Sequence, residues 1–586
     1  MSAEMKVLLI QPPVQDFYET RIRTLPLGLL YIAASLQKEK INVELLDCHS
    51  MGGKREMSIP DKFRYLKKFY PVGDLSPFRL FSKFNHFGMS WEEISAYIQN
   101  SNPAVIGISS LFTPYYKEAL RIAEIACHVV PLCKIILGGH HPALDYKNLL
   151  KLNYVDYIVF GEGERRFCQI VKSLMMHESL KNDGIAYKLK GKIFSAKTSD
   201  VIEHLDELPF PARNLLDNDK YKIGRKNYTM LLTSRGCPQK CTFCSVHLTM
   251  GHKYRKRSVE NVIAEMKECF HQYGTRIFDI EDDNFTWDRS RLLHFLKEVQ
   301  TVFGEESIEL TAMNGLSIAN IDEETLPEMK KAGFKTLNIA PVTMHSEQSV
   351  NLQRPYAFKD YQRVIMLARK SEMQVTAYMI IGYPFESINE MLDSVIALAV
   401  EPVLIGGSVF YPTPGTAVYK KLSLDGLVSA ENYDLYRLSC FSIETENFSR
   451  VDLVTIMRIV RMINFVKGLC DAQVCNQNKT LSMFLKEADE NLLLYNYSAR
   501  LFAGESLNVE GSLNSQEIGI ILLYLLIKEN SFYAFKKNGS EKKDKKKVSY
   551  IAQALEVNQN VLDLFFDKIT GKTIKGVRTK YSLIWE

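Results

Sequence analysis

Short apolar runs alternate with amphipathic segments along the first third of the chain. Five runs have the length and composition of buried strands, at residues 6–13, 41–47, 104–110, 134–139 and 155–164. Three segments between them and one after them carry apolar residues at helical spacing, at residues 25–40, 91–100, 115–130 and 165–174. Strands separated by helices indicate a parallel sheet with right-handed crossovers. The pattern predicts an open, doubly wound (Rossmann-like) α/β domain over residues 1–180, interrupted by an irregular insert from roughly Cys48 to Ser90.

The segment at residues 181–225 is acidic and broken by prolines, which is typical of a linker. After it the alternation resumes, and six strand-like runs with helical segments between them occupy residues 226–431. Six such units fall short of the eight that close a full TIM barrel, so a partial (β/α)6 TIM-like barrel is predicted. Over residues 432–586 amphipathic helices take over, and the apolar run Ile518 to Ile527 is too short to cross a bilayer. We expect a helical C-terminal region and no transmembrane segment.

The composition is that of a soluble globular protein, with 46% hydrophobic and 24% charged residues. The formal net charge of +5 is small for 586 residues, so it gives no reason to expect a nucleic-acid partner. The first residues, MSAEMKVLLIQPP, lack a positively charged leader and a small-residue cleavage site. We therefore expect a cytoplasmic protein, in which clustered cysteines serve metal binding or catalysis rather than disulfides.

Three of the 11 cysteines lie close together directly after the first strand of the predicted barrel. Cys237, Cys241 and Cys244 have the spacing C-x3-C-x2-C. Structural zinc usually takes four protein ligands, and no fourth ligand lies nearby in the sequence. An iron–sulfur cluster held by three thiolates keeps one iron open for a substrate. On spacing alone, a zinc site with a distant fourth ligand and a set of buried thiols are the alternatives.

The stretch SRGCPQKCTFCSV, with Phe243 just before the last cysteine, closely resembles the cluster loop of radical S-adenosylmethionine (radical SAM) enzymes. The resemblance implies that the three cysteines hold a 4Fe–4S cluster, whose open iron binds the amino and carboxylate groups of SAM. It also implies that one electron from the cluster cleaves SAM to a 5′-deoxyadenosyl radical, which abstracts hydrogen from an unreactive C–H bond. In such enzymes the cofactors perform the difficult chemistry, while the protein orients them and excludes water.

Other segments of the predicted barrel resemble the same family. The acidic run Glu281, Asp282 and Asp283 is similar to the strand end that reaches the SAM amino group, and carboxylates suit an ammonium group. The alternative for this run is a solvated turn. Gly382, in MIIGYPFES, is similar to the glycine of the fifth strand that passes the adenine. The segment FYPTPGTAVY resembles the family's sixth-strand ending.

The fourth strand of the predicted barrel departs from the family pattern. That strand usually ends in a sequence such as G-x-E-S, whereas this chain has Pro341, Val342 and Thr343 there. Thr343 supplies a hydroxyl for a SAM contact, but the carboxylate is absent. The departure concerns the local SAM contacts and not the cluster. It is the feature that favours a catalytically degenerate cofactor-binding module as a rival to an enzyme.

The turns of the first domain resemble those of the cobalamin-binding domain that precedes the barrel in many radical SAM enzymes. A doubly wound sheet binds its ligand beyond the carboxyl ends of its strands. Ser109-Ser110-Leu111 is similar to the family's S-x-L motif, and Thr113 follows in the same turn. Gly138 and Gly139 are similar to the glycine pair that lets the backbone approach the nucleotide tail of cobalamin. The GEGE turn at residues 161–164 also fits, and a flavodoxin-like domain without cobalamin is the alternative.

The sequence DCHSMG formally matches D-x-H-x-x-G, the motif whose histidine ligates cobalt from below in base-off cobalamin enzymes. In those enzymes the motif follows the first strand, whereas here it follows the second. We therefore interpret His49 as a coincidence, and we expect His140 and His141 to be loop residues. No secure lower cobalt ligand is predicted, and its absence suits methyl donation.

The two resemblances together predict a cobalamin-dependent radical SAM enzyme that methylates an unactivated carbon of a small molecule or natural product. They imply that one SAM methylates cob(I)alamin and that a second SAM generates the substrate radical, which takes up the methyl group. An external one-electron reductant of the flavodoxin or ferredoxin type is the implied partner. A non-methylating member of the family, such as an oxidative cyclase or a rearranging enzyme, is the alternative. The insert and the C-terminal helices are expected to shape the substrate pocket.

Overall fold

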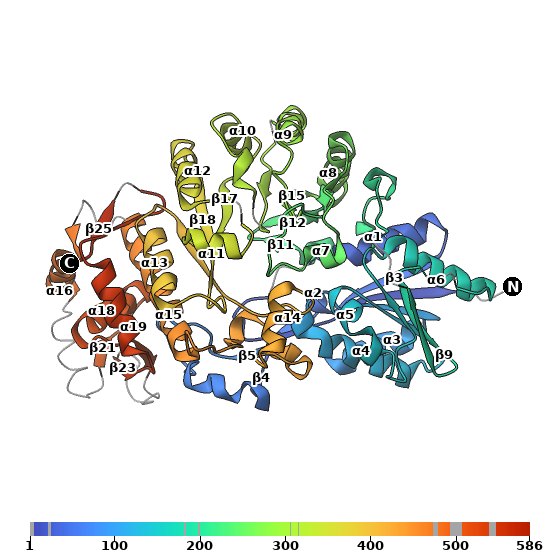
Figure 1. Ribbon diagram of the computed structural model, residues 1–586, viewed down its shortest axis with the longest axis horizontal. Coiled ribbons are helices and arrows are strands. Elements are labelled where there is room, and N and C mark those ends of the chain that lie inside the picture. Colours follow the sequence, from blue (N-terminus) through green and yellow to red (C-terminus); the bar gives the residue numbers. More distant parts are fainter. Residues whose placement is uncertain are drawn as a thin grey trace.

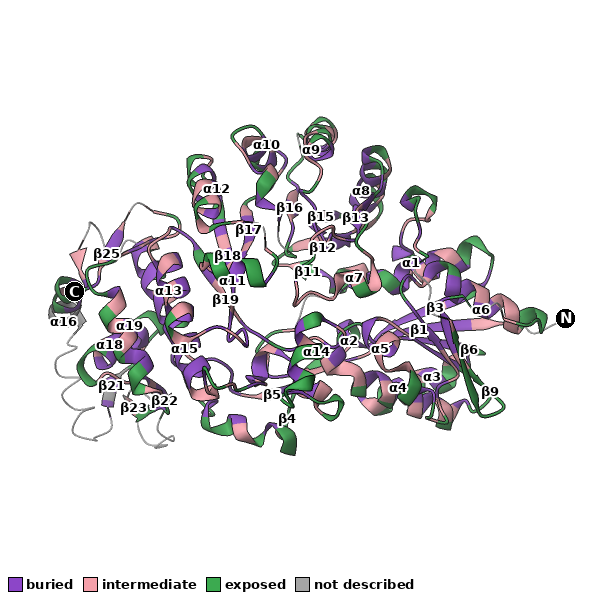
Figure 2. Cartoon of the chain, in the orientation of Figure 1, coloured by how far each residue is buried: buried purple, intermediate pink, exposed green. Residues whose placement is uncertain are grey.

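The computed structural model of the chain describes residues 5–21, 25–180, 183–196, 200–304, 306–314, 316–354, 356–472, 479–492, 507–537, 547–579 and 581–586. Three parts follow one another along its long axis: an N-terminal α/β domain, a central partial barrel and a C-terminal region (Figure 1). Buried residues concentrate on the strands and on the helix faces that cover them (Figure 2).

The N-terminal sheet has seven strands in the order β10-β9-β8-β7-β6-β1-β3. Their bounds are Lys6–Gln11 (β1), Asn42–Asp47 (β3), Val105–Ser109 (β6), Lys134–Gly138 (β7), Tyr157–Val159 (β8), Ile185–Leu189 (β9) and Lys192–Ala196 (β10). The helices are Leu27–Lys38 (α1), Trp91–Ser101 (α3), Tyr116–Val129 (α4), His140–Leu149 (α5) and Glu164–Met176 (α6). Along β1, Val7 and Leu9 pack under α1 and α6, whereas Leu8 and Ile10 pack under α3 and α4. Helices on both faces of a largely parallel sheet confirm the doubly wound domain.

The first domain extends further than the sequence predicted. The hairpin of β9 and β10 adds antiparallel to β8, so the sheet continues to Ala196 instead of ending near residue 180. Ile193 and Phe194 are 37% and 39% exposed, and most other side chains of β10 are exposed too. The hairpin therefore lacks the apolar run by which a buried strand is found in a sequence.

The insert between Cys48 and Ser90 is folded rather than irregular. It contains α2 (Cys48–Met51), β4 (Gly53–Met57), the 3-10 helix η1 (Asp61–Lys68) and β5 (Phe84–Gly88). Strand β5 pairs with β4 on one side and with β2 (Val14–Asp16) on the other. Most aromatic side chains of the insert belong to the same hydrophobic cluster as the barrel and the C-terminal region. The backbone N–H of Leu75 also donates to the carbonyl of Phe535 at 2.8 Å.

Six parallel strands form the central part, which agrees with the predicted partial barrel. They are Lys226–Leu231 (β12), Thr275–Ile280 (β15), Glu309–Thr311 (β16), Thr336–Val342 (β17), Gln374–Ile381 (β18) and Leu404–Val409 (β19). The outer helices are Val259–Tyr273 (α8), Arg289–Phe303 (α9), Thr325–Lys331 (α10), Phe358–Lys370 (α12) and Ile388–Ala399 (α13) (Figure 1). Shorter elements are Lys222–Ile223 (β11), Ser234–Arg235 (β13), Arg255–Lys256 (β14), Val246–Thr249 (α7), Ser346–Asn351 (α11) and Ala417–Leu424 (α14). Isolated bridges from Leu310 to Phe334 and from Leu316 to Ile339 join the sheet that contains β12 to the sheet β17-β18-β19.

The C-terminal region contains the predicted helices and, in addition, strands that the pattern did not predict. The helices are Arg450–Asp471 (α15), Leu481–Leu492 (α16), Ser515–Glu529 (α18) and Gln559–Ile569 (α19). Two small sheets have the orders β21-β23-β22 and β20-β25-β24. Their strands are Lys479–Thr480 (β20), Leu507–Glu510 (β21), Tyr533–Lys537 (β22), Lys547–Ala554 (β23), Thr573–Lys575 (β24) and Ser582–Ile584 (β25). Within the described ranges, no helix has the length and apolar character needed to span a membrane.

Candidate functional site

The loop that carries the three cysteines is anchored by the acidic run at the end of β15. The carboxylate of Asp282 accepts hydrogen bonds from Thr233 N at 2.6 Å, Thr233 Oγ1 at 2.5 Å and Ser234 Oγ at 2.6 Å. Asp283 Oδ2 accepts a hydrogen bond from Gly236 N at 3.1 Å, and burial raises the pKa of Asp283 to about 6. Both oxygens of Asp282 are thus used to fix the cluster loop. Three acidic residues were predicted to meet the SAM amino group. One of them, Asp282, already accepts hydrogen bonds from Thr233 and Ser234 with both carboxylate oxygens.

The three cysteines lie on one loop and influence one another electrostatically. Burial, with smaller contributions from the neighbouring thiols of Cys241 and Cys237, raises the pKa of Cys244 to about 11. Asn284 Nδ2 donates to Cys237 Sγ at 3.7 Å. Among the residues that the structure describes, no group of three or more His, Cys, Asp or Glu side chains is arranged to hold a metal ion. The loop itself offers three thiolates, which is the donor set of an iron–sulfur cluster with one open iron.

Arg354 is a residue of this site that the sequence analysis missed. Its Nη1 donates to Cys241 Sγ at 3.6 Å and to Gln239 Oε1 at 3.0 Å, and its Nη2 donates to Ala340 O at 2.7 Å. Although burial opposes its charge, Tyr361 and Cys241 raise the pKa of Arg354. No motif marks a lone arginine in the sequence. A fixed positive charge beside a cluster sulfur favours the extra negative charge that the cluster gains on reduction.

Replacing Arg354 with glutamine is expected to leave the iron content unchanged and to make the cluster harder to reduce. The midpoint potential should fall by roughly 60 mV, which corresponds to a tenfold change in a one-electron equilibrium. A redox titration monitored by electron paramagnetic resonance measures the shift. Arg369→Gln, at the exposed end of α12, is the control. Equal potentials in the two variants would show that Arg354 does not tune the cluster.

Two other predicted SAM residues, Glu281 and Thr343, follow the carboxyl ends of β15 and β17. Glu281 Oε2 accepts a hydrogen bond from Asn314 Nδ2 at 2.9 Å, and burial raises the pKa of Glu281 to about 7. Thr343 Oγ1 donates to Glu386 Oε1 at 3.3 Å. Glu386 is only 2% exposed, and burial raises its pKa to about 8, with Glu390 adding to the shift. The contacts of Glu281 and Thr343 with SAM stay predictions.

The end of β17, where the sequence departs from the family pattern, is strained. Thr343 N donates to Pro341 O at 2.8 Å, and Val342 between them has a φ of 67°. Positive φ is a true outlier for a β-branched residue, and such strain costs about 1–3 kcal/mol. In the neighbouring strand β18, Met379 pairs with Val342, and Gly382 just beyond that strand has a φ of 79° and an added Cβ that would lie 2.9 Å from Leu453. Glycine is thus required at position 382 by its positive φ and by the close contact with α15. This requirement is independent of the predicted contact with adenine.

The carboxyl edge of the N-terminal sheet presents polar atoms without partners. Within the described residues, Ser110 Oγ and Thr113 Oγ1 are buried and form no hydrogen bond. Leu111, between them, is 56% exposed. A Cβ added to Gly138 would have no atom within 4 Å. Gly139 has a φ of 111°, and a Cβ added to it would lie 2.6 Å from Ser110 O. This edge therefore combines two hydroxyl groups without hydrogen-bond partners with a backbone conformation, at Gly139, that favours glycine.

The histidines of the first domain lie in packed surroundings. His49 is 1% exposed in α2, where Asp47 Oδ1 caps the helix by accepting from His49 N at 3.1 Å. His141 is also 1% exposed, and its ring lies 4.5 Å from Tyr116 and 5.3 Å from Tyr433, measured between centroids. Burial lowers the pKa of His141 to about 3, so its ring is neutral. Both rings are buried, and His140 and His141 lie in the first turn of α5 rather than in a loop as predicted.

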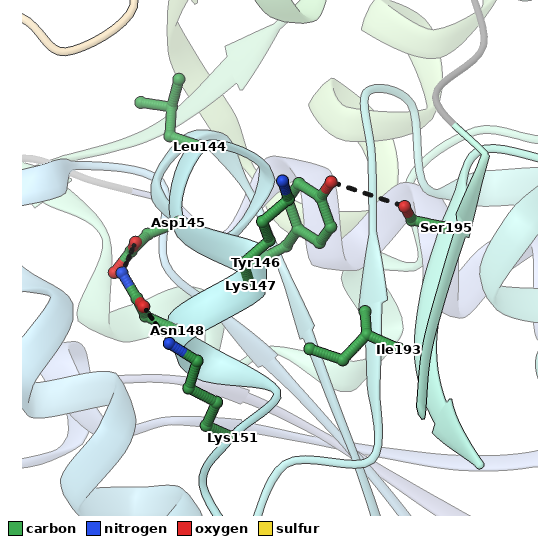
Figure 3. Close-up of a pocket in the computed structure, with 8 residues that line it drawn as sticks. All are labelled: Leu144, Asp145, Tyr146, Lys147, Asn148, Lys151, Ile193 and Ser195. Carbon is green, nitrogen blue, oxygen red and sulfur yellow. Dashed lines mark hydrogen bonds between the residues drawn. The ribbon is translucent and has the colours of Figure 1, made fainter. Parts of the chain in front are cut away.

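The carboxyl edge of the N-terminal sheet lies against the barrel segments that follow the cysteines and β19. A Cβ on Gly161 would lie 3.5 Å from Thr249 O, and one on Gly415 would lie 2.8 Å from Leu144 Cδ2. A separate cavity of about 660 Å³ lies beside this edge, between α5 and the β9–β10 hairpin (Figure 3). It is lined by Leu144, Asp145, Tyr146, Lys147, Asn148, Lys151, Ile193 and Ser195, and by none of the predicted site residues.

Comparison with known families decides what this arrangement is. Residues 83–171 match the family described as "B12 binding domain", and residues 231–397 match the "Radical SAM superfamily". The chain therefore contains a B12-binding domain followed by a radical SAM domain. The family implies a 4Fe–4S cluster, SAM and cobalamin as cofactors. The three-thiolate loop fits the first, and the unpaired hydroxyls and glycine pair at the sheet edge fit the last.

Curated relatives of this radical SAM protein include several enzymes named as methyltransferases. It is 24% identical to an uncharacterized methyltransferase of Pyrococcus horikoshii over 78% of this chain and 91% of the relative. It is 28% identical to cytidylyl-2-hydroxyethylphosphonate methyltransferase of Streptomyces wedmorensis over 74% of this chain and 84% of the relative. A third relative, at 25% identity over 57% of this chain and 61% of its own length, is an anaerobic magnesium-protoporphyrin IX monomethyl ester cyclase of Rubrivivax gelatinosus.

Solved structures share the fold of this radical SAM protein. The cobalamin-dependent SAM radical enzyme OxsB, with aqua-cobalamin and SAM bound, has a TM-score of 0.60 at 14% identity and covers 96% of this chain and 78% of its own. The radical SAM methyltransferase TsrM of Kitasatospora setae has a TM-score of 0.56 at 16% identity and covers 72% of this chain and 75% of its own. The overall arrangement of cobalamin-binding domain and barrel is therefore that of known structures.

Proposed function

We propose that this radical SAM protein is a cobalamin-dependent methyltransferase that attaches a methyl group to an unactivated carbon of a small molecule. The observation that carries the proposal is the contact between the carboxyl edge of the cobalamin-binding sheet and the segment after the cluster loop. A methyl carrier and a radical generator placed at one interface can act on one substrate atom. The two relatives that match most of their length are named as methyltransferases, which supports this choice.

When bound, the cluster and SAM supply a carbon-centred radical, and cobalamin supplies a methyl group. The protein's own part is to hold and orient these groups. Cys237, Cys241 and Cys244 provide the thiolates, and Arg354 places a cation beside one of them. Asp282 and Asp283 fix the backbone from which the first cysteine projects. We further propose a cytoplasmic location and an external one-electron donor of the flavodoxin or ferredoxin type.

Anaerobic turnover with methyl-deuterated SAM and candidate substrates tests the proposal. We expect a product that has gained the intact CD3 group, together with 5′-deoxyadenosine and S-adenosylhomocysteine. Cys241→Ala should give neither the labelled product nor 5′-deoxyadenosine. Mass spectrometry of the product distinguishes the outcomes.

An oxidative cyclase is the second candidate, and the match to the magnesium-protoporphyrin cyclase favours it. A cyclase would consume hydrogen from its substrate and transfer no deuterated methyl group. A product that has lost hydrogen without gaining label would therefore overturn the methyltransferase proposal in favour of this candidate.

A further inference from the structure

A buried network of ion pairs connects the cobalamin-binding domain to the cluster loop. Arg235 Nη1 lies 2.6 Å from Glu162 Oε1, and Arg235 Nη2 lies 2.6 Å from Glu164 Oε1. Arg255 Nη1 lies 2.9 Å from Glu162 Oε2. The side chains of all four residues are 5% exposed or less. We call these four residues the interdomain clasp.

The clasp joins segments that lie far apart in the sequence. Glu162 and Glu164 belong to the GEGE turn between β8 and α6 in the first domain. Arg235 and Arg255 are paired opposite each other on the hairpin β13–β14 of the barrel. Arg235 is two residues before Cys237, so the clasp holds the backbone at the entrance of the cluster loop.

The linker between the domains is tied to the same carboxylate. Ile202 N donates to Glu162 Oε2 at 2.7 Å, and Arg255 Nη1 donates to Ile202 O at 2.6 Å. Glu162 thus receives hydrogen bonds from the cluster hairpin and from the linker while its own backbone belongs to the cobalamin-binding domain. One carboxylate fixes three segments relative to one another.

Both partners of the clasp are held in their charged forms. Although burial alone would raise it, the Arg235 guanidinium lowers the pKa of Glu162, assisted by Ile202 N and Arg255. The guanidinium of Arg235 also lies over the Tyr31 ring, 5.1 Å from its centroid. Removing one partner from a buried ion pair leaves an uncompensated charge, so the loop must shift or take up water.

We propose that Glu162 and Glu164 are positioning residues that hold the cluster loop at a fixed place against the cobalamin-binding edge. This inference rests on the proposed methyltransferase function. The GEGE turn resembles a cofactor-binding turn in sequence. In this proposal it affects the cofactors only by positioning the cluster loop. Ligation of the cluster uses barrel residues alone, so it does not need the clasp.

The step that depends on the clasp is the transfer of a methyl group between the two halves of the site. With SAM and cobalamin bound, the methyl group would pass from the sulfonium sulfur of SAM to the reduced cobalamin, which would contribute the electron pair of the new bond, and S-adenosylhomocysteine would be released. Such a transfer would need donor and acceptor held in a near-attack geometry, and a misplacement of about 1 Å can cost about 100-fold in rate. Reductive cleavage of SAM to 5′-deoxyadenosine occurs within the barrel and lacks this requirement.

Glu162→Gln and Glu164→Gln, made in the full chain with reconstituted cluster, test the inference. We expect iron content and dithionite-driven 5′-deoxyadenosine formation within about twofold of the unaltered protein. Formation of S-adenosylhomocysteine with added cob(I)alamin should fall about tenfold, a 1.4 kcal/mol effect. Glu203→Gln is the matched control, because Glu203 pairs with Lys253 of the same hairpin region at 2.6 Å but the two side chains are 46% and 68% exposed. Glu164→Asp should recover part of the loss.

A second readout needs neither cofactor nor activity. Amide hydrogen exchange of the chain without cofactors should increase at residues 233–237 in Glu164→Gln and stay unchanged in Glu203→Gln. The positioning role would be overturned if the formation of 5′-deoxyadenosine and of S-adenosylhomocysteine fell equally in the variants, or if the ratio of these two products did not change. If the unaltered protein forms no S-adenosylhomocysteine, the methyltransferase proposal fails, and unchanged exchange at residues 233–237 would then overturn the clasp separately.

Discussion

Replacing Cys241 with alanine is expected to abolish both the iron–sulfur cluster and the cleavage of SAM. Cys241 is one of three thiolates on the loop, it is only 7% exposed, and Arg354 donates to its sulfur. Two remaining thiolates do not supply the ligands that a 4Fe–4S cluster with an open iron requires. Iron and sulfide analysis after anaerobic reconstitution, with chromatography of 5′-deoxyadenosine, measures the loss. Cys237→Ala and Cys244→Ala should behave in the same way.

Cys127→Ala is the matched control for these variants, because Cys127 is a free cysteine on α4 in the other domain. It should retain the full iron content and SAM cleavage. Zinc without iron in the anaerobically purified protein would contradict the cluster assignment, as would a Cys241→Ala variant that still cleaves SAM.

Replacing Gly139 with valine should weaken cobalamin binding by at least tenfold, which is about 1.4 kcal/mol. The backbone there has a φ of 111°, and an added Cβ would lie 2.6 Å from Ser110 O. A β-branched side chain cannot adopt that conformation without strain, so the turns after β6 and β7 must separate. These turns carry the unpaired hydroxyls of Ser110 and Thr113 that fit the cofactor. Titration of the full chain with hydroxocobalamin, followed by absorbance, gives the dissociation constant.

Gly191→Val is the control for Gly139→Val. Gly191 also has a positive φ, 79°, but nothing lies within 4 Å of its added Cβ, and it is in the turn of the β9–β10 hairpin. It should bind cobalamin as the unaltered protein does. An unchanged dissociation constant in Gly139→Val would remove the glycine pair from the cobalamin site.

Local patterns predicted the order of the two α/β parts and the loop that carries the cluster. Apolar runs alternating with amphipathic segments are sufficient to identify parallel strands, because such strands are buried on both faces. The β9–β10 hairpin was missed because its outer strand is largely exposed. The small C-terminal sheets were missed because β21 pairs with β23, some 40 residues further along the chain, and short strands of that kind have little apolar content to detect.

The sequence indicates the candidate cluster ligands, whose role stays a prediction, but it does not indicate the residues that support them. Three closely spaced cysteines can be recognised in the sequence as a candidate cluster motif. Arg354 cannot, because it contacts Cys241 only through the packing of the fourth barrel unit. The acidic run was found, yet the sequence could not tell that Asp282 faces Thr233 and Ser234. Likewise, Glu162 shows no sign in the sequence that its partners are Arg235 and Arg255. Which charged groups meet across a domain boundary depends on tertiary geometry that no local pattern contains.

The contact between the insert and the C-terminal region bears on how the chain is made. Phe535 N donates to Asp74 Oδ1 at 3.0 Å across a separation of 461 residues. During synthesis the insert emerges early, and although Phe63 and Phe84 pair within it, Phe78 must wait for Phe532 near the other end of the chain. Contacts of such long separation slow folding, and exposed aromatic surface favours aggregation in the meantime. A shortened chain that ends after the barrel would leave the surface around Phe78 without Phe465 and Phe532, so such a truncation is expected to promote aggregation.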